Sequence, residues 1–161
     1  MKNRVKQTLI HIAFGIYILI MLWLMFGQRI AQLVNAPASS PTVGYWSEFL
    51  EKLNVVPFET IIYYSRSLAK GINSAAIVNL VGNVVMFIPL GFFLPCVSKK
   101  ARTLKGDIVM ALICILCAEI VQVFTLLGYF DVDDLILNML GVYVGFLLYA
   151  SVFRRSVKSK D

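Results

Sequence analysis

The sequence has little charge for its length, and this scarcity decides the class of protein. Charged residues make up 15% of the 161 residues, whereas hydrophobic residues make up 59%. A soluble domain is about 45–50% apolar, and a chain this short has no core large enough to bury the excess. The surplus apolar surface must therefore face lipid, which excludes a separate soluble domain and predicts one membrane domain over residues 1–161.

Histidine and cysteine are also scarce. The one histidine, His11, lies in the first apolar run, which excludes a zinc site built from histidines. The three cysteines, Cys96, Cys114 and Cys117, lie within or beside apolar runs, so a disulfide framework is not expected. The composition thus gives no reason to expect a metal or another cofactor.

Four apolar stretches are long enough to cross a bilayer, which takes about 20 helical residues. They cover residues 9–26, 75–94, 108–127 and 135–153. Only helices and closed barrels satisfy backbone polar groups in lipid, and continuous apolar runs indicate helices rather than strands. The predicted fold class is therefore all-α and integral to the membrane, a bundle of four transmembrane helices.

The basic residues predict how these spans are oriented. Eleven of the fifteen Lys and Arg fall on one side if the spans alternate, and this side should be cytoplasmic. They are Lys2, Arg4 and Lys6 before the first span, Lys99, Lys100, Arg102 and Lys105 before the third, and Arg154, Arg155, Lys158 and Lys160 after the fourth. We therefore expect a multi-pass protein of the plasma membrane with both termini in the cytoplasm. The net charge of +6 reflects this topology and not a nucleic-acid surface.

A cleaved signal peptide is the alternative to a first span. The apolar stretch is longer than the usual core of about 7–15 residues in a signal peptide. In addition, Pro37 follows the best small-residue site, Val34-Asn35-Ala36, and signal peptidase tolerates proline there poorly. We therefore expect the first span to be retained.

The long outer loop between the first two spans, residues 27–74, contains amphipathic segments. Trp46, Phe49 and Leu50 recur at helical spacing, which predicts a short helix lying on the membrane surface. Pro57 is suited to open a second interfacial helix, since proline fits the first helical turn. Two interpretations stay open, a plain anchoring loop and a lid over a site.

Eight polar residues lie inside or at the outer edge of spans two to four. They are Asn79 and Asn83 in span two, Glu119 and Gln122 in span three, and Asp131, Asp133, Asp134 and Asn138 at the start of span four. A helical rise of about 1.5 Å per residue places all of them in the outer half of the membrane. A charge at the bilayer centre costs about 2.5–3.5 kcal/mol on insertion scales, so such residues face the bundle interior and mark function. We predict that the eight form one binding pocket, open outward.

Other roles for these residues remain as alternatives. The amides are able to join the helices through interhelical hydrogen bonds, with Glu119 protonated, and Gly141-x-x-x-Gly145 is typical of a helix-packing face. Asp131, Asp133 and Asp134 form a weak candidate site for a hard divalent cation. Capping of a helix N-terminus is the commoner role of such acids.

Four segments, taken in order, resemble the VanZ-like family of membrane proteins. They are Asn54-Val-Val-Pro57-Phe58, the stretch from Val78 to Gly91 with Asn79, Gly82, Asn83 and Pro89, the pair Glu119-Ile-Val-Gln122, and the block from Phe130 to Gly141 with Asp131, Asp134 and Asn138. The resemblance covers about residues 54–145. A basic residue often precedes the acidic block in this family, whereas this chain has Tyr129 there. The resemblance implies a Gram-positive cell envelope and, from the member that names the family, resistance to the lipid-tailed glycopeptide teicoplanin.

Three functions are compatible with these observations. The first is binding or handling of an amphiphilic envelope lipid or lipid-tailed glycopeptide in the outer leaflet, contributing to teicoplanin resistance. The second is an intramembrane enzyme that modifies a lipid head group, with Glu119 as general acid or base and Asp133 or Asp134 orienting a partner. No Ser/His pair or other nucleophile–base arrangement is evident, so we favour binding over catalysis. The third is a structural membrane protein whose polar groups serve only assembly.

Overall fold

The computed structural model describes residues 2–27, 30, 31, 34 and 44–153. Four of its helices are long and apolar enough to cross a membrane: Arg4–Gly27, Ser74–Val97, Leu104–Phe124 and Val132–Phe153. The all-α fold class with four spanning helices is confirmed. The C-terminal basic residues 154–160, and residues 35–37 of the possible cleavage site, lie outside the described residues.

Several of the spans are built from more than one helical segment. In chain order the elements are α1 (Lys2–Leu22), η1 (Trp23–Gly27), α3 (Tyr45–Glu51), β1 (Leu53–Asn54), α4 (Glu59–Lys70), α5 (Ser74–Ile77), η2 (Val78–Gly82), α6 (Asn83–Val97), η3 (Lys100–Arg102), α7 (Leu104–Phe124), β2 (Phe130–Asp131) and α8 (Val132–Phe153). The segments η1 and η2 are π-helical. Such widened turns are rare and occur frequently at functional sites.

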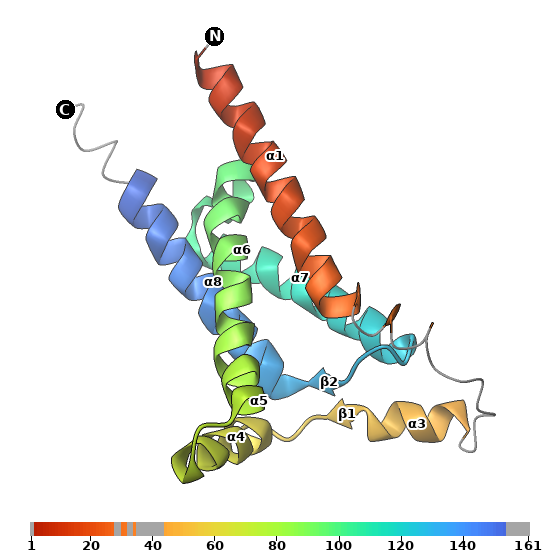
Figure 1. Ribbon diagram of the computed structural model, residues 1–161. Coiled ribbons are helices and arrows are strands. Elements are labelled where there is room, and N and C mark those ends of the chain that lie inside the picture. The colour runs from red at the N-terminus through yellow and green to blue at the C-terminus, as the bar shows by residue number, and fades with distance from the viewer. Residues whose placement is uncertain (1, 28–29, 32–33, 35–43, 154–161) are drawn as a thin grey trace.

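Three helix ends that the sequence places beside basic residues lie on the same side of the molecule. Figure 1 shows the start of α1, the end of α6 and the end of α8 on one side of the molecule. The short helices α3 and α4 lie on the opposite side, α4 beside the start of α8 and α3 toward the end of α7 (Figure 1). The assignment of the first side to the cytoplasm stays a prediction.

The closest contact in the bundle joins α6 and α8. A Cβ atom at Gly141 would collide with the carbonyl oxygen of Val84, and one at Gly145 with that of Ile88. From the other helix, a Cβ at Gly91 would collide with the backbone of Val142. Small residues at these positions let the two backbones touch, which is the main source of helix association where lipid removes the hydrophobic driving force. The predicted packing face is confirmed.

The first helix packs on the outside of this pair. Phe14 and Tyr17 contact Phe93 of α6 through their rings, and the Tyr17 hydroxyl donates a hydrogen bond to the Met86 carbonyl at 3.0 Å. Large apolar side chains such as Leu19 remain exposed along the rest of α1. This surface suits contact with lipid.

Both predicted helices of the outer loop are present, as α3 and α4, and the segment around them is tied to the α7–α8 connection. Strand β1 pairs in parallel with β2, so that Leu53 is opposite Phe130 and Asn54 is opposite Asp131. The Tyr45 hydroxyl donates to the Phe124 carbonyl at 2.7 Å, at the C-terminal end of α7. These contacts fix α4 across the ends of the spans.

Candidate functional site

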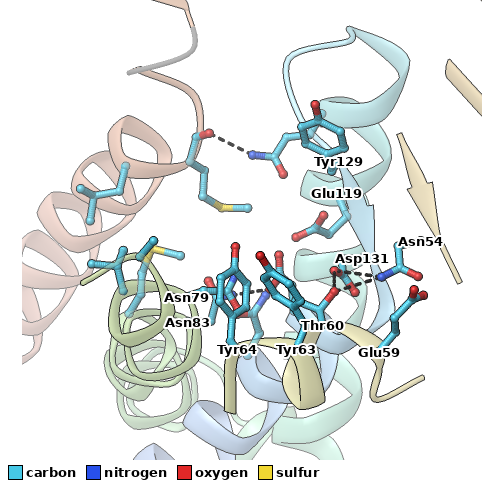
Figure 2. Close-up of a pocket in the computed structure, with 18 of the residues that line it drawn as sticks. Asn54, Glu59, Thr60, Tyr63, Tyr64, Asn79, Asn83, Glu119, Tyr129 and Asp131 are labelled. Atoms are coloured by element: carbon cyan, nitrogen blue, oxygen red, sulfur yellow. Dashed lines mark hydrogen bonds between the residues drawn. The ribbon is translucent and has the colours of Figure 1, made fainter. Parts of the chain in front are cut away.

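A cavity of about 1020 Å³ opens between η1, α4, η2, α6, α7 and α8. Figure 2 shows Glu119 of α7, Asn79 and Asn83 of the second span, and Tyr63 and Tyr64 of α4 around the same space. The lining residues are Leu24, Met25, Leu53, Asn54, Glu59, Thr60, Tyr63, Tyr64, Ala75, Val78, Asn79, Asn83, Met86, Glu119, Gln122, Tyr129, Asp131, Asp134 and Asn138. The cavity is therefore bounded by all four spans and by the outer segment.

Seven of the eight predicted site residues line this one cavity. They are Asn79, Asn83, Glu119, Gln122, Asp131, Asp134 and Asn138. The structure thus brings together polar residues from three different spans. These residues, which we placed in the outer half of the membrane from their sequence positions, therefore lie around one cavity.

Two amide oxygens at the cavity lack hydrogen-bond partners among the described residues. They are Oδ1 of Asn79 and Oδ1 of Asn138, and both atoms are buried. Asn138 as a whole is only 2% exposed. A buried acceptor left without a donor costs about 1–3 kcal/mol, so the fold keeps two acceptors at the cavity at some cost in stability.

Asn79 owes its position to the π-helical segment η2, which interrupts the second span between α5 and α6. The extra residue in a π turn rotates the residues on either side relative to a regular helix. Asn79 and Asn83 nevertheless both line the cavity. The backbone irregularity therefore lies at the site itself.

The third span contributes a buried carboxyl and a buried amide. Glu119 is 4% exposed and lines the cavity. Gln122, one turn further, donates from Nε2 to the carbonyl oxygen of Met25 at 3.0 Å. Met25 belongs to the π-helical segment η1. This bond joins the end of the first span to α7 at the cavity wall.

The fourth span begins at the cavity with two acids in different environments. Oδ1 of Asp134 accepts a hydrogen bond from Nδ2 of Asn83 at 2.5 Å, which connects α8 to α6. Oδ2 of Asp131 accepts from the Thr60 hydroxyl at 2.6 Å and from Nδ2 of Asn54 at 3.3 Å. Oδ1 of Asp131 accepts from the backbone N–H of Asp133 at 2.8 Å. Asp131 is thus a capping residue of α8 and also holds the outer segment.

Asp133 is the one predicted site residue that does not line the cavity. It is 0% exposed, and its carboxylate accepts hydrogen bonds from the backbone N–H groups of Phe58 at 2.6 Å and Ile61 at 3.0 Å. These donors belong to the first turn of α4, which starts after Phe58 with φ +68°. Both oxygens of Asp133 therefore cap α4, and the geometry gives this residue a structural role in place of the binding or catalytic role we expected.

The acidic stretch does not converge on one point. Asp131, Asp133 and Asp134 direct their carboxylates to different partners. Within residues 2–27, 30, 31, 34 and 44–153, no group of three or more His, Cys, Asp or Glu side chains is placed to hold a metal ion. Asp131 and Asp133 accept hydrogen bonds from backbone N–H groups, as capping acids do.

The outer loop was open to interpretation as a lid over a site, but none of the α4 residues that line the cavity was among the eight predicted site residues. Glu59, Thr60, Tyr63 and Tyr64 line it from α4, and Tyr129 lines it from the α7–α8 connection. The Asn54-x-x-Pro57-Phe58 motif was the available signal, because it precedes α4 and carries Asn54, a partner of Asp131.

The comparison with protein families agrees with the fold of membrane-spanning helices. A model of the VanZ/LLP1 family matches residues 14–154. The chain belongs to the VanZ/LLP1 family. The match extends beyond residues 54–145 and takes in most of the first span, so the VanZ/LLP1 region includes all the walls of the cavity. Comparisons with curated proteins and with solved structures give no significant match.

Proposed function

We propose that this VanZ/LLP1 protein binds the head group of an amphiphile, an envelope lipid or a lipid-tailed glycopeptide, from the outer leaflet of the plasma membrane. The observation that carries the proposal is one cavity lined by six polar residues of the membrane-spanning segments and by Asp131 of β2. Polar groups inside a bilayer are costly, and they mark ligand pathways when they converge on a common space. Binding of this kind would contribute to resistance against teicoplanin.

The buried acceptors support a ligand rather than mere assembly. Helix-joining amides have partners on the neighbouring helix, as Asn83 has in Asp134. Oδ1 of Asn79 and Oδ1 of Asn138 have none in the described chain. A bound molecule with N–H or O–H donors would satisfy both oxygens and recover the cost of burying them.

The position of the cavity supports a membrane ligand. Two of its apolar lining residues, Leu24 and Val78, are themselves exposed, at 50% and 70%. They belong to membrane-spanning segments, so the cavity is continuous with a surface that faces lipid. A head group is therefore able to reach the cavity sideways from the leaflet without crossing water.

Catalysis remains the alternative, and it depends on Glu119. No serine, cysteine or histidine is among the described residues that line the cavity. The hydroxyl of Thr60 donates to Asp131, and Asp133 caps α4. An enzyme would therefore have to use Glu119 or Asp134 with a nucleophile brought by the substrate or by water.

Mass spectrometry of lipids that co-purify with the protein tests the proposal. The protein and an Asn138→Leu variant, which keeps the branched shape of the side chain and removes the amide, are extracted in native lipid discs. We expect one lipid class to be enriched with the protein and lost with Asn138→Leu. Ser151→Ala on the same helix is the control, because the Ser151 hydroxyl bonds only the Leu148 carbonyl within α8. Equal lipid profiles for the protein and Asn138→Leu would refute binding in this cavity.

A susceptibility assay tests the link to resistance. A sensitive Gram-positive host expressing the protein should need more teicoplanin for growth inhibition than a host expressing Asn138→Leu at the same level. A glycopeptide without a lipid tail is the matched control, and its inhibitory concentration should be equal in both strains. An equal inhibitory concentration of teicoplanin in the two strains would show that lipid binding in the cavity does not contribute to resistance.

A further inference from the structure

The cavity is strongly biased toward hydrogen-bond acceptors and negative charge. Four carboxylates line it, from Glu59, Glu119, Asp131 and Asp134, and no Lys, Arg or His is among its described lining residues. The buried oxygens of Asn79 and Asn138 are further acceptors. Three tyrosine rings, Tyr63, Tyr64 and Tyr129, complete the wall. Carboxylates beside aromatic faces are the surroundings that proteins use to bind ammonium groups.

Lys52 lies close to Tyr129 of the cavity wall, but it does not offset the negative charge of the cavity. Its Nζ pairs with Glu48 at 3.0 Å and donates to the Leu126 carbonyl at 2.5 Å. It also lies 5.6 Å from the ring centroid of Tyr129, on the side of α3. Lys52 therefore belongs to the attachment of the outer segment, and it is not a cavity residue.

A second hollow of about 600 Å³ adjoins the cavity along α4, and its charge is opposite. It is lined by Glu59, Ile62, Tyr63, Arg66, Ser67 and Lys70, so Glu59 and Tyr63 belong to both hollows. Arg66 and Lys70 are exposed. Neither forms an ion pair with an acid in the part of the chain that the structure describes. Two basic side chains thus stand beside an acidic cavity.

The helical spacing of α4 aligns these charges. Glu59, Tyr63, Arg66 and Lys70 follow one another at intervals of four, three and four residues, which places them on one face of the helix. Arg66 lies seven residues after Glu59, or about 10 Å along the axis. The face therefore runs from an acidic end at the cavity to a basic end at the second hollow.

We infer that the amphiphile is a phospholipid whose head group ends in an ammonium group, separated from the phosphate by a spacer of several bonds. This inference rests on the proposed function, because it assigns the head group of the same ligand. The ammonium occupies the acidic cavity and is held by charge-assisted hydrogen bonds to carboxylates and amide oxygens. The phosphate lies on Arg66 and Lys70, since guanidinium and ammonium groups are the usual phosphate partners.

The distances distinguish between head groups. The separation of about 10 Å along α4 is longer than the two-carbon link of phosphatidylethanolamine. It suits an aminoacyl ester of phosphatidylglycerol, in which the amino acid carries the ammonium away from the phosphate. Beyond the phosphate, the exposed side chain of Ile62 in the second hollow provides an apolar contact for the start of the acyl chains.

Binding of three lipids with the same acyl chains, measured against a phosphatidylcholine background, tests the inference. The purified protein in phosphatidylcholine discs is titrated with lysyl-phosphatidylglycerol, phosphatidylethanolamine and phosphatidylglycerol, each with a fluorescent tail, while phosphatidylcholine is the background. We expect lysyl-phosphatidylglycerol to bind at least about tenfold more tightly than phosphatidylglycerol, which corresponds to one charge-assisted interaction gained. Phosphatidylethanolamine should lie between them. Equal affinity for the lysyl and glycerol lipids would overturn the ammonium assignment.

Charge removal on α4 tests the second half of the head-group assignment. The double variant Arg66→Gln/Lys70→Gln should weaken binding of lysyl-phosphatidylglycerol about tenfold. Binding of a lysyl alkyl ester, which has the ammonium and a tail but no phosphate, should be unchanged. Lys99→Gln/Lys100→Gln, which removes the same charge at the α6–α7 connection, is the control and should change neither.

The outcomes separate this inference from the proposed function. If Arg66→Gln/Lys70→Gln changes nothing while Asn138→Leu still abolishes binding, the phosphate assignment is wrong and the cavity remains an amphiphile site. If phosphatidylethanolamine binds as tightly as the lysyl lipid, the long spacer is wrong. If no lipid binds in a way that depends on Asn138, the proposed function fails, and the head-group assignment fails with it.

Discussion

The pair formed by α6 and α8 has two halves that differ in what lies between the helices. From about the middle of the two spans onward, Gly91, Gly141 and Gly145 bring the backbones of α6 and α8 into direct contact. Toward their starts, the polar pair Asn83 and Asp134 bridges the helices through side chains, and a cavity of about 1020 Å³ opens beside them. The two helices are thus in direct backbone contact in one half, whereas a cavity lined by polar residues lies beside them in the other half.

The difference shows how a small membrane protein separates stability from function. In lipid, tight van der Waals packing of small residues is the main way to hold helices together. The glycine half provides this contact and leaves no space for a ligand. It thereby allows the polar half to keep unsatisfied acceptors such as Oδ1 of Asn138, which lower stability there. Changes in the two halves should therefore have different effects.

The largest effect is expected from added volume in the packed half. Gly145→Leu would force a side chain into the Ile88 carbonyl. Overpacking typically costs about 1–3 kcal/mol, and a backbone obstacle places this site at the upper end or beyond. We expect little folded protein in size-exclusion chromatography of detergent extracts. Gly15→Leu is the control, because nothing lies within 4 Å of a Cβ there. Normal yield of Gly145→Leu would show that the helix contact is dispensable.

The next effect is expected at Asp133, which supports the hollow half from outside the cavity. Asp133→Ala would leave the N–H groups of Phe58 and Ile61 without their acceptor, at a cost of about 1–3 kcal/mol. The thermal unfolding midpoint should fall, and lipid binding should weaken because α4 loses its cap. Asp133→Asn retains one acceptor oxygen and should lose about half as much stability. A variant that loses binding with an unchanged midpoint would instead assign Asp133 to the ligand.

Substitutions of Glu119 sharpen the comparison inside the cavity. Glu119→Leu should weaken binding of the amphiphile about tenfold, because it removes a carboxyl group that lines the cavity. Glu119→Gln keeps the hydrogen-bonding shape but removes the charge that an ammonium group would meet, so its binding should lie between that of Glu119→Leu and that of the unchanged protein. Lipid co-purification measures both. Binding of Glu119→Gln equal to that of the unchanged protein would show that the charge of Glu119 does not contribute to holding the ammonium group.

The smallest effect is expected where the cavity wall meets the first helix. Gln122→Leu removes the hydrogen bond to the Met25 carbonyl. Interhelical hydrogen bonds in membranes average about 0.6 kcal/mol, with a maximum near 1.7. Reversible unfolding in mixed micelles should show a loss of this size. Thr125→Val is the control, since the Thr125 hydroxyl bonds carbonyls of its own helix. A loss of several kcal/mol would mean that Gln122 organises more than this contact.

Much of the architecture was predictable because it depends on composition along single segments. The four spans follow from apolar length, and the helix contact follows from the spacing of Gly141 and Gly145. The convergence of Asn83, Glu119 and Asn138 followed from a common depth, since helices that cross the same slab place equal depths side by side. Each of these inferences needed only the helical repeat and the position of the membrane surface.

The contacts between distant segments were not predictable in the same way. Nothing in the spacing of Asp131, Asp133 and Asp134 distinguishes the residue that caps α4 from those that line the cavity. That distinction depends on the pairing of β1 with β2, which brings residues more than seventy positions apart into hydrogen-bonding distance. The π-helical segments η1 and η2 likewise depend on packing that no local propensity encodes.

The sequence by itself determined that the chain lies in a membrane, how many times it crosses, and at which depth its polar residues sit, because the bilayer imposes length and polarity on each helix separately. The tertiary structure decided which of these polar residues share a space. It made Asp133 a cap, brought Tyr63 and Tyr64 to the cavity, and left two amide oxygens there without a partner. The reason is that a cavity is the volume left between segments, and their relative placement depends on contacts between residues far apart in the chain.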